Sequence, residues 1–156
     1  MTDRSPYALT SAAVAATAVL GGIGTAPGTR WYRQLDKPPW QPPGWAFGPA
    51  WTVLYVLLAV AGGRALTVAA APARRRYLRA YLANLALNAG WTWLFFRGRR
   101  PAVATAEAVL LAVSTADLAR RSGVLDRRAG AALVPYGAWT TFAAALTASI
   151  ARRNPR

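Results

Sequence analysis

The side chains that most often carry enzyme chemistry are scarce in this sequence, which contains no histidine and no cysteine. Their absence excludes thiolate chemistry, disulfide bonds, the usual zinc sites and the common axial ligands of haem, and it removes the commonest general base. Polar and aromatic groups that stand within apolar runs include Asn84, Asn88, Glu107, Trp51 and Trp139. They form no acid–base or nucleophile–base pair, and we predict no metal site. Such groups instead either join neighbouring helices or line a pocket for a ligand.

The stretch from Trp31 to Tyr55 is the part of the chain richest in aromatic rings and prolines. It holds four of the seven Trp and five of the eleven Pro, namely Trp31, Trp40, Trp45, Trp51, Pro38, Pro39, Pro42, Pro43 and Pro49. Proline fixes φ and removes a backbone donor, so residues 38–43 are predicted to be neither regular helix nor central strand. Such dense rings favour a stiff loop that covers an apolar site. An aromatic belt at a membrane surface is the alternative for the first three Trp, whereas Trp51 is assigned to a cavity.

Five apolar segments must position these side chains. They are predicted at residues 6–27, 46–70, 76–97, 101–120 and 130–151. A helix needs about 20 apolar residues to cross the hydrocarbon core of a bilayer. Short basic connections follow the second, third and fourth segments, which indicates antiparallel neighbours. We therefore expect residues 1–156 to form one all-α integral membrane domain, a bundle of five transmembrane helices with a structured Trp/Pro-rich loop between the first two.

The net charge of +14 could suggest a nucleic-acid partner, but the distribution of the charges favours a lipid bilayer. Arginines gather in short clusters that bound long uncharged runs, as at the ends of membrane helices, rather than along one face. A soluble bundle would need a polar face on every helix, which the first and last segments lack. Because Arg4 precedes the first segment, a signal peptide is an alternative interpretation of that segment. The orientation stays open, because nine Lys and Arg residues flank each side.

Each of the last four segments carries aromatic or polar residues on one helical stripe. Spacings of three and four group Phe47, Trp51, Tyr55 and Leu58; Asn84, Asn88, Trp91 and Phe95; Glu107, Leu111 and Ser114; and Tyr136, Trp139, Ala143 and Leu146. Carboxylates and amides at membrane depth are disfavoured against lipid, so the stripes should face the bundle interior. Two interpretations stay open: the polar groups join helices, or they line a pocket with Trp51 and Trp139.

Short motifs built on Trp, Tyr and Pro extend over about residues 30–150. They comprise Trp31-Tyr32, Leu35, Lys37-Pro38, Trp40, Pro42-Pro43, Pro49, Trp51-Thr52 and Leu54-Tyr55, then Leu85-Ala86-Leu87-Asn88, Trp91 and Leu94-Phe95-Phe96, then Pro135-Tyr136, Ala138-Trp139 and Phe142-Ala143. The patterns WYxxLxKPxWxPP and WTxLY are the most specific of these. Together the motifs resemble the TspO/MBR family, which comprises tryptophan-rich sensory proteins and translocator proteins of the peripheral benzodiazepine receptor type.

The resemblance implies five transmembrane helices, a loop between the first two that closes over a central pocket, and a homodimer. It also implies binding of porphyrins and, in some members, of benzodiazepine- or isoquinoline-type drugs and sterols. The ligand-binding positions that it implies are Tyr32, Trp51, Asn84, Asn88, Trp91, Glu107, Trp139, Ala143 and Leu146. One departure argues against sterol binding, because Ala148 stands where the family's sterol motif has a tyrosine.

The function that we expect is that of a porphyrin-binding sensor or regulator in a bacterial cytoplasmic membrane. Metal-free protoporphyrin IX is the expected ligand, because iron would lack its common protein ligands, and no cofactor is expected to be required. Arg30, Arg33 or Lys37 of the loop would pair with its propionates. One alternative is a light- and oxygen-dependent porphyrin-degrading enzyme, in which Trp51 and Trp139 would handle oxidising equivalents. Another is a small-ligand transporter.

Two small residues on the third segment predict where a homodimer would form. Ala86 and Gly90 lie about 200° around that helix from Asn84 and Asn88. If the Asn pair faces the pocket, the small pair faces outward, where two helix backbones can approach closely in lipid. Packing of the small pair within the same chain is the alternative.

Overall fold

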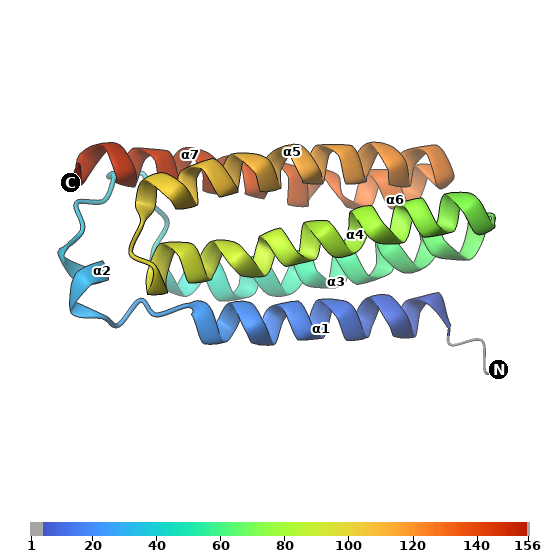
Figure 1. Cartoon of the computed structure of the whole chain (residues 1–156), viewed down its shortest axis with the longest axis horizontal. Helices are drawn as coiled ribbons and strands as arrows, with labels where there is room; N and C mark the ends of the chain where they lie inside the picture. The colour runs from blue at the N-terminus through green and yellow to red at the C-terminus, as the bar shows by residue number, and fades with distance from the viewer. Residues whose placement is uncertain (1–4, 156) are drawn as a thin grey trace.

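Five long helices lie side by side in the computed structural model, which describes residues 5–155 (Figure 1). They are α1 (Pro6–Gly24), α3 (Gly44–Val68), α4 (Ala71–Thr92), α5 (Pro101–Leu125) and α7 (Val134–Arg153). The short helices α2 (Arg30–Gln34) and α6 (Arg127–Ala132) and a π-helical turn, η1 (Trp93–Arg97), lie between them in the chain. Helix α2 and the carboxyl terminus lie at one end of the bundle, and α6 lies at the other (Figure 1). Arg4 lies outside the described residues.

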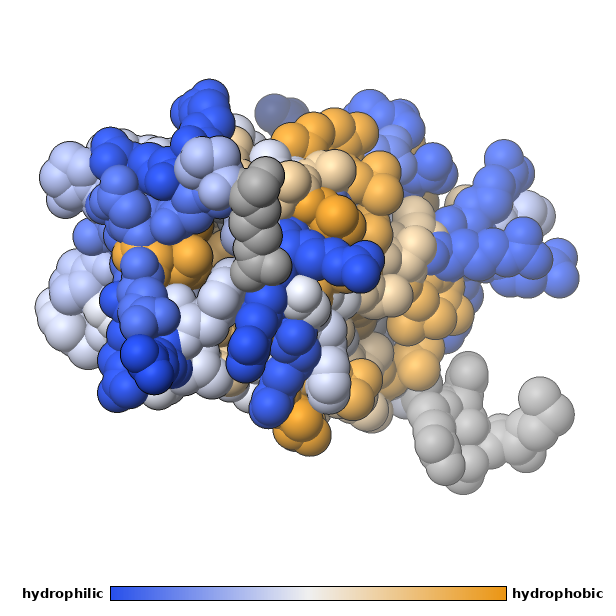
Figure 2. All heavy atoms as spheres, turned by 60° about the vertical axis from the view of Figure 1, so that its left-hand side comes forward, coloured by the Kyte–Doolittle hydropathy of each residue, from blue (hydrophilic) through white to orange (hydrophobic). Residues whose placement is uncertain are grey.

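The outer surface of the bundle carries many large apolar side chains. Val19 and Ile23 of α1, Val56 of α3, and Leu110 and Val113 of α5 are each more than half exposed. By length and composition, α1, α3 and α5 can each cross a membrane. Figure 2 shows hydrophilic residues gathered toward the ends and hydrophobic residues over much of the surface between them. Because so much exposed apolar surface is unusual in contact with water, the structure is that of an integral membrane protein.

Helix α1 is packed into the bundle along α3 and α4. The hydroxyl group of Thr10, which is completely buried, donates a hydrogen bond to the Ala59 carbonyl of α3 at 2.8 Å. At the other end of α1, the indole N–H of Trp93 donates to the carbonyl of Leu20 at 3.0 Å. These contacts favour the interpretation of the first segment as a helix of the bundle over a removable signal peptide.

Two helices extend beyond the bounds expected from the sequence. Helix α4 begins at Ala71, so the arginines of residues 74–76 are helical and do not form a connection. Pro72 lies in its first turn, where a missing N–H costs no hydrogen bond, and arginine favours helix. Helix α5 continues to Leu125 rather than ending at residue 120. Asp117 supports this extension, because its carboxylate pairs with Arg120 at 2.7 Å and Arg121 at 2.6 Å.

The last predicted segment is divided into α6 and α7 at Leu133. Pro135 explains the break, because it has no N–H to donate to the carbonyl of Ala131. The loop expected between the first two segments, residues 6–27 and 46–70, is partly helical, since Trp31 belongs to α2 and Trp45 to α3. Residues 38–43 are non-helical, as the prolines predict.

An ion pair fixes the corner between α5 and α6. The Asp126 carboxylate accepts hydrogen bonds from the backbone N–H groups of Arg128 and Ala129, which caps α6. The same carboxylate pairs with the Arg64 guanidinium of α3 at 2.7 Å. The hydrogen bond from Arg64, followed by those from the backbone, holds the pKa of Asp126 below its usual range. This residue therefore joins α3, α5 and α6 at the end of the bundle opposite α2.

Candidate functional site

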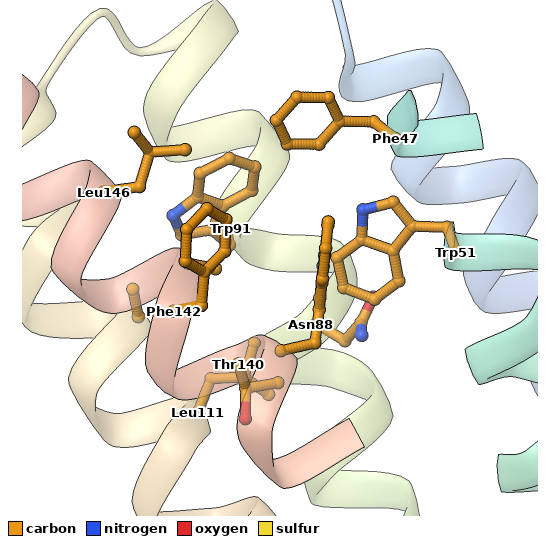
Figure 3. Close-up of a pocket in the computed structure, with 11 residues that line it drawn as sticks. Phe47, Trp51, Asn88, Trp91, Leu111, Thr140, Phe142 and Leu146 are labelled. Carbon is orange, nitrogen blue, oxygen red and sulfur yellow. The ribbon is translucent and has the colours of Figure 1, made fainter. Parts of the chain in front are cut away.

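A small cavity of about 50 Å³ lies between α3, α4, α5 and α7. Five aromatic side chains line it, together with two polar and four aliphatic ones: Phe47, Trp51, Asn88, Trp91, Ala108, Leu111, Trp139, Thr140, Phe142, Ala143 and Leu146. Figure 3 shows these side chains converging from different helices, with Phe47 and Trp51 on one side and Phe142 and Leu146 on the other. Rings that meet around a few polar groups form a surface suited to a flat, largely apolar ligand.

The aromatic walls contact one another across the cavity. The rings of Trp51 and Trp139 meet edge to face, with centroids 6.3 Å apart and planes at 83°. Trp139 also contacts Phe47, at 5.8 Å, and Phe142, at 5.4 Å. On the α4 side, Trp91 stacks on Phe95 of η1 at 5.3 Å and 12°. Because edge-to-face and stacked rings attract one another, the cavity walls stay in contact when no ligand separates them.

A buried chain of hydrogen bonds connects four helices beside the cavity. The Tyr55 hydroxyl donates to Asn88 Oδ1 at 3.1 Å, and Asn88 Nδ2 donates to the Tyr136 hydroxyl at 2.9 Å. The Tyr136 hydroxyl donates to Asn84 Oδ1 at 2.9 Å, and Asn84 Nδ2 donates to Thr115 Oγ1 at 3.0 Å. Every link joins two helices, so these polar groups fix how α3, α4, α5 and α7 pack around the cavity.

Six of the nine predicted ligand positions line the cavity: Trp51, Asn88, Trp91, Trp139, Ala143 and Leu146. Three do not. Asn84 is completely buried within the hydrogen-bond chain, and Tyr32 lies on α2. Glu107 is half-buried beside the cavity-lining Ala108, and among the described residues neither of its buried carboxylate oxygens has a hydrogen-bond partner. Each of the two interpretations of the polar stripes therefore holds for some residues. Asn84 joins helices, whereas Asn88 both joins helices and lines the cavity.

The segment of residues 29–43, called here the cover segment, packs over the α2 end of the bundle. Tyr32 lies against Phe96 of η1 with ring centroids 5.2 Å apart, and Trp40 lies against Phe142 of α7 at 5.8 Å. Asn154 fastens the segment to the end of α7. Its side chain accepts a hydrogen bond from the backbone N–H of Asp36 and donates one to the Asp36 carbonyl, both at 2.9 Å. The cover segment is thus held on both sides of the cavity.

Lysine 37 has a structural part in the cover segment. Its ammonium group donates to the carbonyls of Tyr32, at 2.7 Å, and Leu35, at 3.2 Å, and lies 4.5 Å from the Tyr32 ring centroid. These contacts occupy the cation within the segment. Of the three cations expected to meet ligand carboxylates, Arg30 and Arg33 are the ones exposed on α2.

Five cavity residues were not among the predicted ligand positions: Phe47, Ala108, Leu111, Thr140 and Phe142. Phe47 and Leu111 lie on the predicted stripes, four residues from Trp51 and from Glu107, so helical spacing alone identifies them. Phe142 lies three residues after Trp139 and follows the same rule. Ala108 and Thr140 carry no such signal, because small side chains line a cavity only where the neighbouring helix leaves space.

Comparisons with known proteins agree with the motifs. The model of the TspO/MBR family matches residues 9–153. The tryptophan-rich sensory protein of Cereibacter sphaeroides is 39% identical over 124 residues, which cover 80% of this chain and 77% of that protein. CrtK of Rhodobacter capsulatus is 36% identical over 143 residues, with 90% and 89% covered. The translocator protein of Ovis aries is 35% identical over 126 residues, with 76% and 72% covered. The resemblance predicted from the Trp- and Pro-rich motifs is therefore confirmed, and the chain belongs to the TspO/MBR family.

Proposed function

We propose that this protein binds a porphyrin in the cavity between α3, α4, α5 and α7 and acts as a membrane sensor or regulator. The observation that carries the proposal is the aromatic lining, in which Trp51, Trp91 and Trp139 present rings from three helices. A porphyrin is a flat, largely apolar disc that stacks on such rings. The indole N–H of Trp91 is buried without an acceptor among the described residues, so it is available to a polar atom of a ligand.

The same proposal includes five transmembrane helices. Helices α4 and α7 have 22 and 20 residues. At 1.5 Å per residue they are about 33 Å and 30 Å long, which matches the hydrocarbon core of a bilayer. Both lie alongside α5, which is apolar enough to cross a membrane. A cavity among these helices would open at membrane depth, where an apolar ligand concentrates.

Binding would require the cavity to open. Its 50 Å³ compares with about 300–1,000 Å³ in typical ligand pockets, so a porphyrin does not fit between the rings as they stand. Separating Trp51 from Trp139 and lifting Trp40 away from Phe142 would enlarge the cavity and release the cover segment. Because the ligand then prefers the open arrangement, its binding shifts the population of conformers. Such a shift is what a sensor needs to report its ligand.

The exposed arginines of α2 would hold the propionates of the porphyrin. Arg30 and Arg33 lie at the end of the bundle that the cover segment closes, whereas Lys37 is occupied by backbone carbonyls. A guanidinium forms paired hydrogen bonds with a carboxylate, which would orient the disc with its propionates toward the membrane surface. The apolar edge of the disc would then enter between Trp51 and Trp139.

Titration of the purified protein with protoporphyrin IX in the dark tests the proposal. A saturable, one-to-one red shift of the Soret band with quenching of Trp fluorescence supports it, and a linear, unsaturable response contradicts it.

A second candidate, light-dependent porphyrin degradation, is favoured by the direct contact of Trp51 and Trp139, through which oxidising equivalents could pass. Illumination of the complex in air separates the two. Ligand recovered unchanged supports the sensor, and a new protein-dependent product supports the enzyme.

The prolines of the cover segment are expected to slow ligand release. Pro42 and Pro43 lie between Trp40 and the start of α3 and restrict the backbone, which lowers the entropy lost when the segment closes on a ligand. Replacing both with glycine should raise the porphyrin off-rate about fourfold to thirtyfold, since each change costs about 0.4–1 kcal/mol and the two together about 0.8–2 kcal/mol. Stopped-flow displacement measures this rate. Pro27→Gly, in the connection before α2, is the control. A large loss of melting temperature with an unchanged off-rate would show a purely structural loop.

A homodimer through α4 is the proposed assembly. Ala86 is exposed on this helix, and a Cβ atom added at Gly90 would meet no heavy atom within 4 Å among the described residues. Asn84 and Asn88 are buried on the opposite side, so the small pair faces away from the cavity. Helix backbones approach closely in lipid at such small residues.

Replacing both Ala86 and Gly90 with leucine should give a monomer that still binds porphyrin, because the added side chains project away from the cavity. Light scattering in detergent measures the mass, and Val56→Leu, which adds bulk at an exposed position of α3 outside the proposed interface, serves as the control. A double variant that remains a dimer would place the interface elsewhere. Loss of porphyrin binding with retained folding would mean that this face contributes to the ligand site.

A further inference from the structure

A second cavity lies at the opposite end of the bundle from the cover segment. It is an open cleft of about 280 Å³ between the first turns of α4 and the last turns of α5, lined by Ala73, Arg76, Tyr77, Arg120, Arg121, Val124 and Leu125. In Figure 1 the start of α4 and the end of α5 lie at the α6 end of the bundle, whereas α2 lies at the other. The cleft shares no residue with the aromatic cavity, so it is a separate feature of the molecule.

Positive charge dominates this cleft. Three guanidinium groups line it, and Asp117 is the carboxylate that pairs with two of them, Arg120 and Arg121. Arg76 forms no ion pair with any residue from 5 to 155. Three positive charges against one negative leave an excess of two. An anion with one or two negative charges would therefore complete the cleft electrostatically.

The floor and one wall of the cleft are apolar and rigid. The ring of Tyr77 is 2% exposed, and its hydroxyl lies 2.8 Å from Ser122 Oγ, so the floor makes its own hydrogen bond. Val124 is 79% exposed at the rim, and Val113, three turns earlier on the outer face of α5, is 62% exposed. A small inorganic anion would gain nothing from these apolar side chains. A molecule with an anionic head and a hydrocarbon chain would use both parts of the surface.

We propose that this cleft binds the headgroup of an anionic phospholipid, with Arg76, Arg120 and Arg121 around the phosphate and an acyl chain along the exposed apolar face of α5. Guanidinium groups bind phosphate oxygens through paired hydrogen bonds. Basic clefts between transmembrane helices at the membrane surface are suited to such headgroups. The lipid would join α4 to α5 at this end of the bundle and would not enter the aromatic cavity.

Native mass spectrometry of the purified protein tests this inference with two lipids of matched acyl chains, phosphatidylglycerol and phosphatidylcholine. One phosphatidylglycerol is expected to bind at least tenfold more tightly than phosphatidylcholine. Arg76→Gln should weaken the anionic lipid about fivefold, since one cation near a membrane surface contributes about that factor. Arg75→Gln is the matched control, because it removes the same charge from the same helix at a residue outside the cleft. It should change the affinity less than twofold.

Several results would overturn the inference. Both lipids carry a phosphate, and phosphatidylcholine also carries a cationic choline, so equal binding would show that the net negative charge of the headgroup does not contribute to binding. An equal loss in the Arg75 and Arg76 variants would show a diffuse positive field rather than a site. Displacement of the lipid by millimolar inorganic phosphate would identify a site for the free ion.

Arg76→Lys keeps the positive charge without the planar guanidinium fork and should retain part of the affinity for the anionic lipid. If both Arg76 variants unfold in detergent, Arg121→Gln is tested instead, by the rise in melting temperature that phosphatidylglycerol causes. Loss of this rise in Arg121→Gln supports lipid binding in the cleft, and an undiminished rise contradicts it.

Discussion

Replacing Trp139 with phenylalanine is expected to weaken protoporphyrin IX binding about fivefold to a hundredfold, and Trp51→Phe should have a similar effect. Burial and stacking of such rings contribute about 1–3 kcal/mol each, and the smaller ring loses much of that contact. Both residues line the cavity, and their rings meet edge to face at 6.3 Å. Each variant should nevertheless fold, because a phenyl ring still fills most of the space. Soret titration of each variant in the dark measures the affinity.

Trp45→Phe is the control for these variants. Trp45 lies in the first turn of α3 but is 77% exposed and does not line the cavity, so the variant should bind porphyrin with the affinity of the unchanged protein. An unaltered Kd in both the Trp51 and Trp139 variants would remove these residues from the site. A comparable loss in the Trp45 variant would indicate that the ligand binds on the exposed aromatic surface instead.

Tyr136→Phe is expected to cause the largest loss of stability among conservative changes in this protein. The Tyr136 hydroxyl accepts from Asn88 Nδ2 and donates to Asn84 Oδ1, both at 2.9 Å, and its side chain is completely buried. Removing this one oxygen leaves two buried amide groups short of a partner without changing the shape of the core. Such groups cost about 1–3 kcal/mol, which should lower the melting temperature by several degrees.

Thermal unfolding in detergent, followed by circular dichroism, measures the effect of Tyr136→Phe. Tyr7→Phe is the matched control, because Tyr7 is 41% exposed on α1 and the substitution removes a hydroxyl group from the surface rather than from the core. An equal melting temperature for the two variants would show that the hydrogen-bond chain does not stabilise the bundle. Porphyrin affinity should also fall modestly in the Tyr136 variant, because Asn88 lines the cavity and loses one of the bonds that orient it.

The helix faces could be predicted from the sequence because period and polarity act locally. Asn84, Asn88 and Tyr136 are buried, as expected of polar groups at membrane depth. The partners of these groups could not be predicted. Tyr136 meets Asn84 across 52 positions of the chain, and that pairing depends on how α4 and α7 are aligned, which no local pattern specifies. The same alignment decides whether an inward-facing amide only joins helices, as Asn84 does, or also lines the cavity, as Asn88 does.

The cover segment shows a second limit of sequence reasoning. Its prolines predict a non-helical stretch at residues 38–43, and the structure has one. The role of Lys37 was not predictable, because a cation in a loop is equally suited to a ligand carboxylate and to nearby backbone carbonyls. The chain's turn after α2 brings the carbonyls of Tyr32 and Leu35 within hydrogen-bond distance of its ammonium group. The closed volume of the cavity likewise depends on rotamers of Trp51 and Trp139 that spacing alone does not specify.

The central claim is that a porphyrin lies among Trp51, Trp91 and Trp139. Fluorine NMR of protein labelled with 5-fluorotryptophan tests it directly, because the seven Trp give seven signals that single Trp→Phe variants assign. A porphyrin ring current shifts only the nuclei close to the disc. On addition of protoporphyrin IX, the signals of Trp51, Trp91 and Trp139 should shift strongly, and those of the exposed Trp45 and Trp93 should stay in place. Strong shifts confined to Trp45 and Trp93, with the three cavity signals unmoved, would contradict the account.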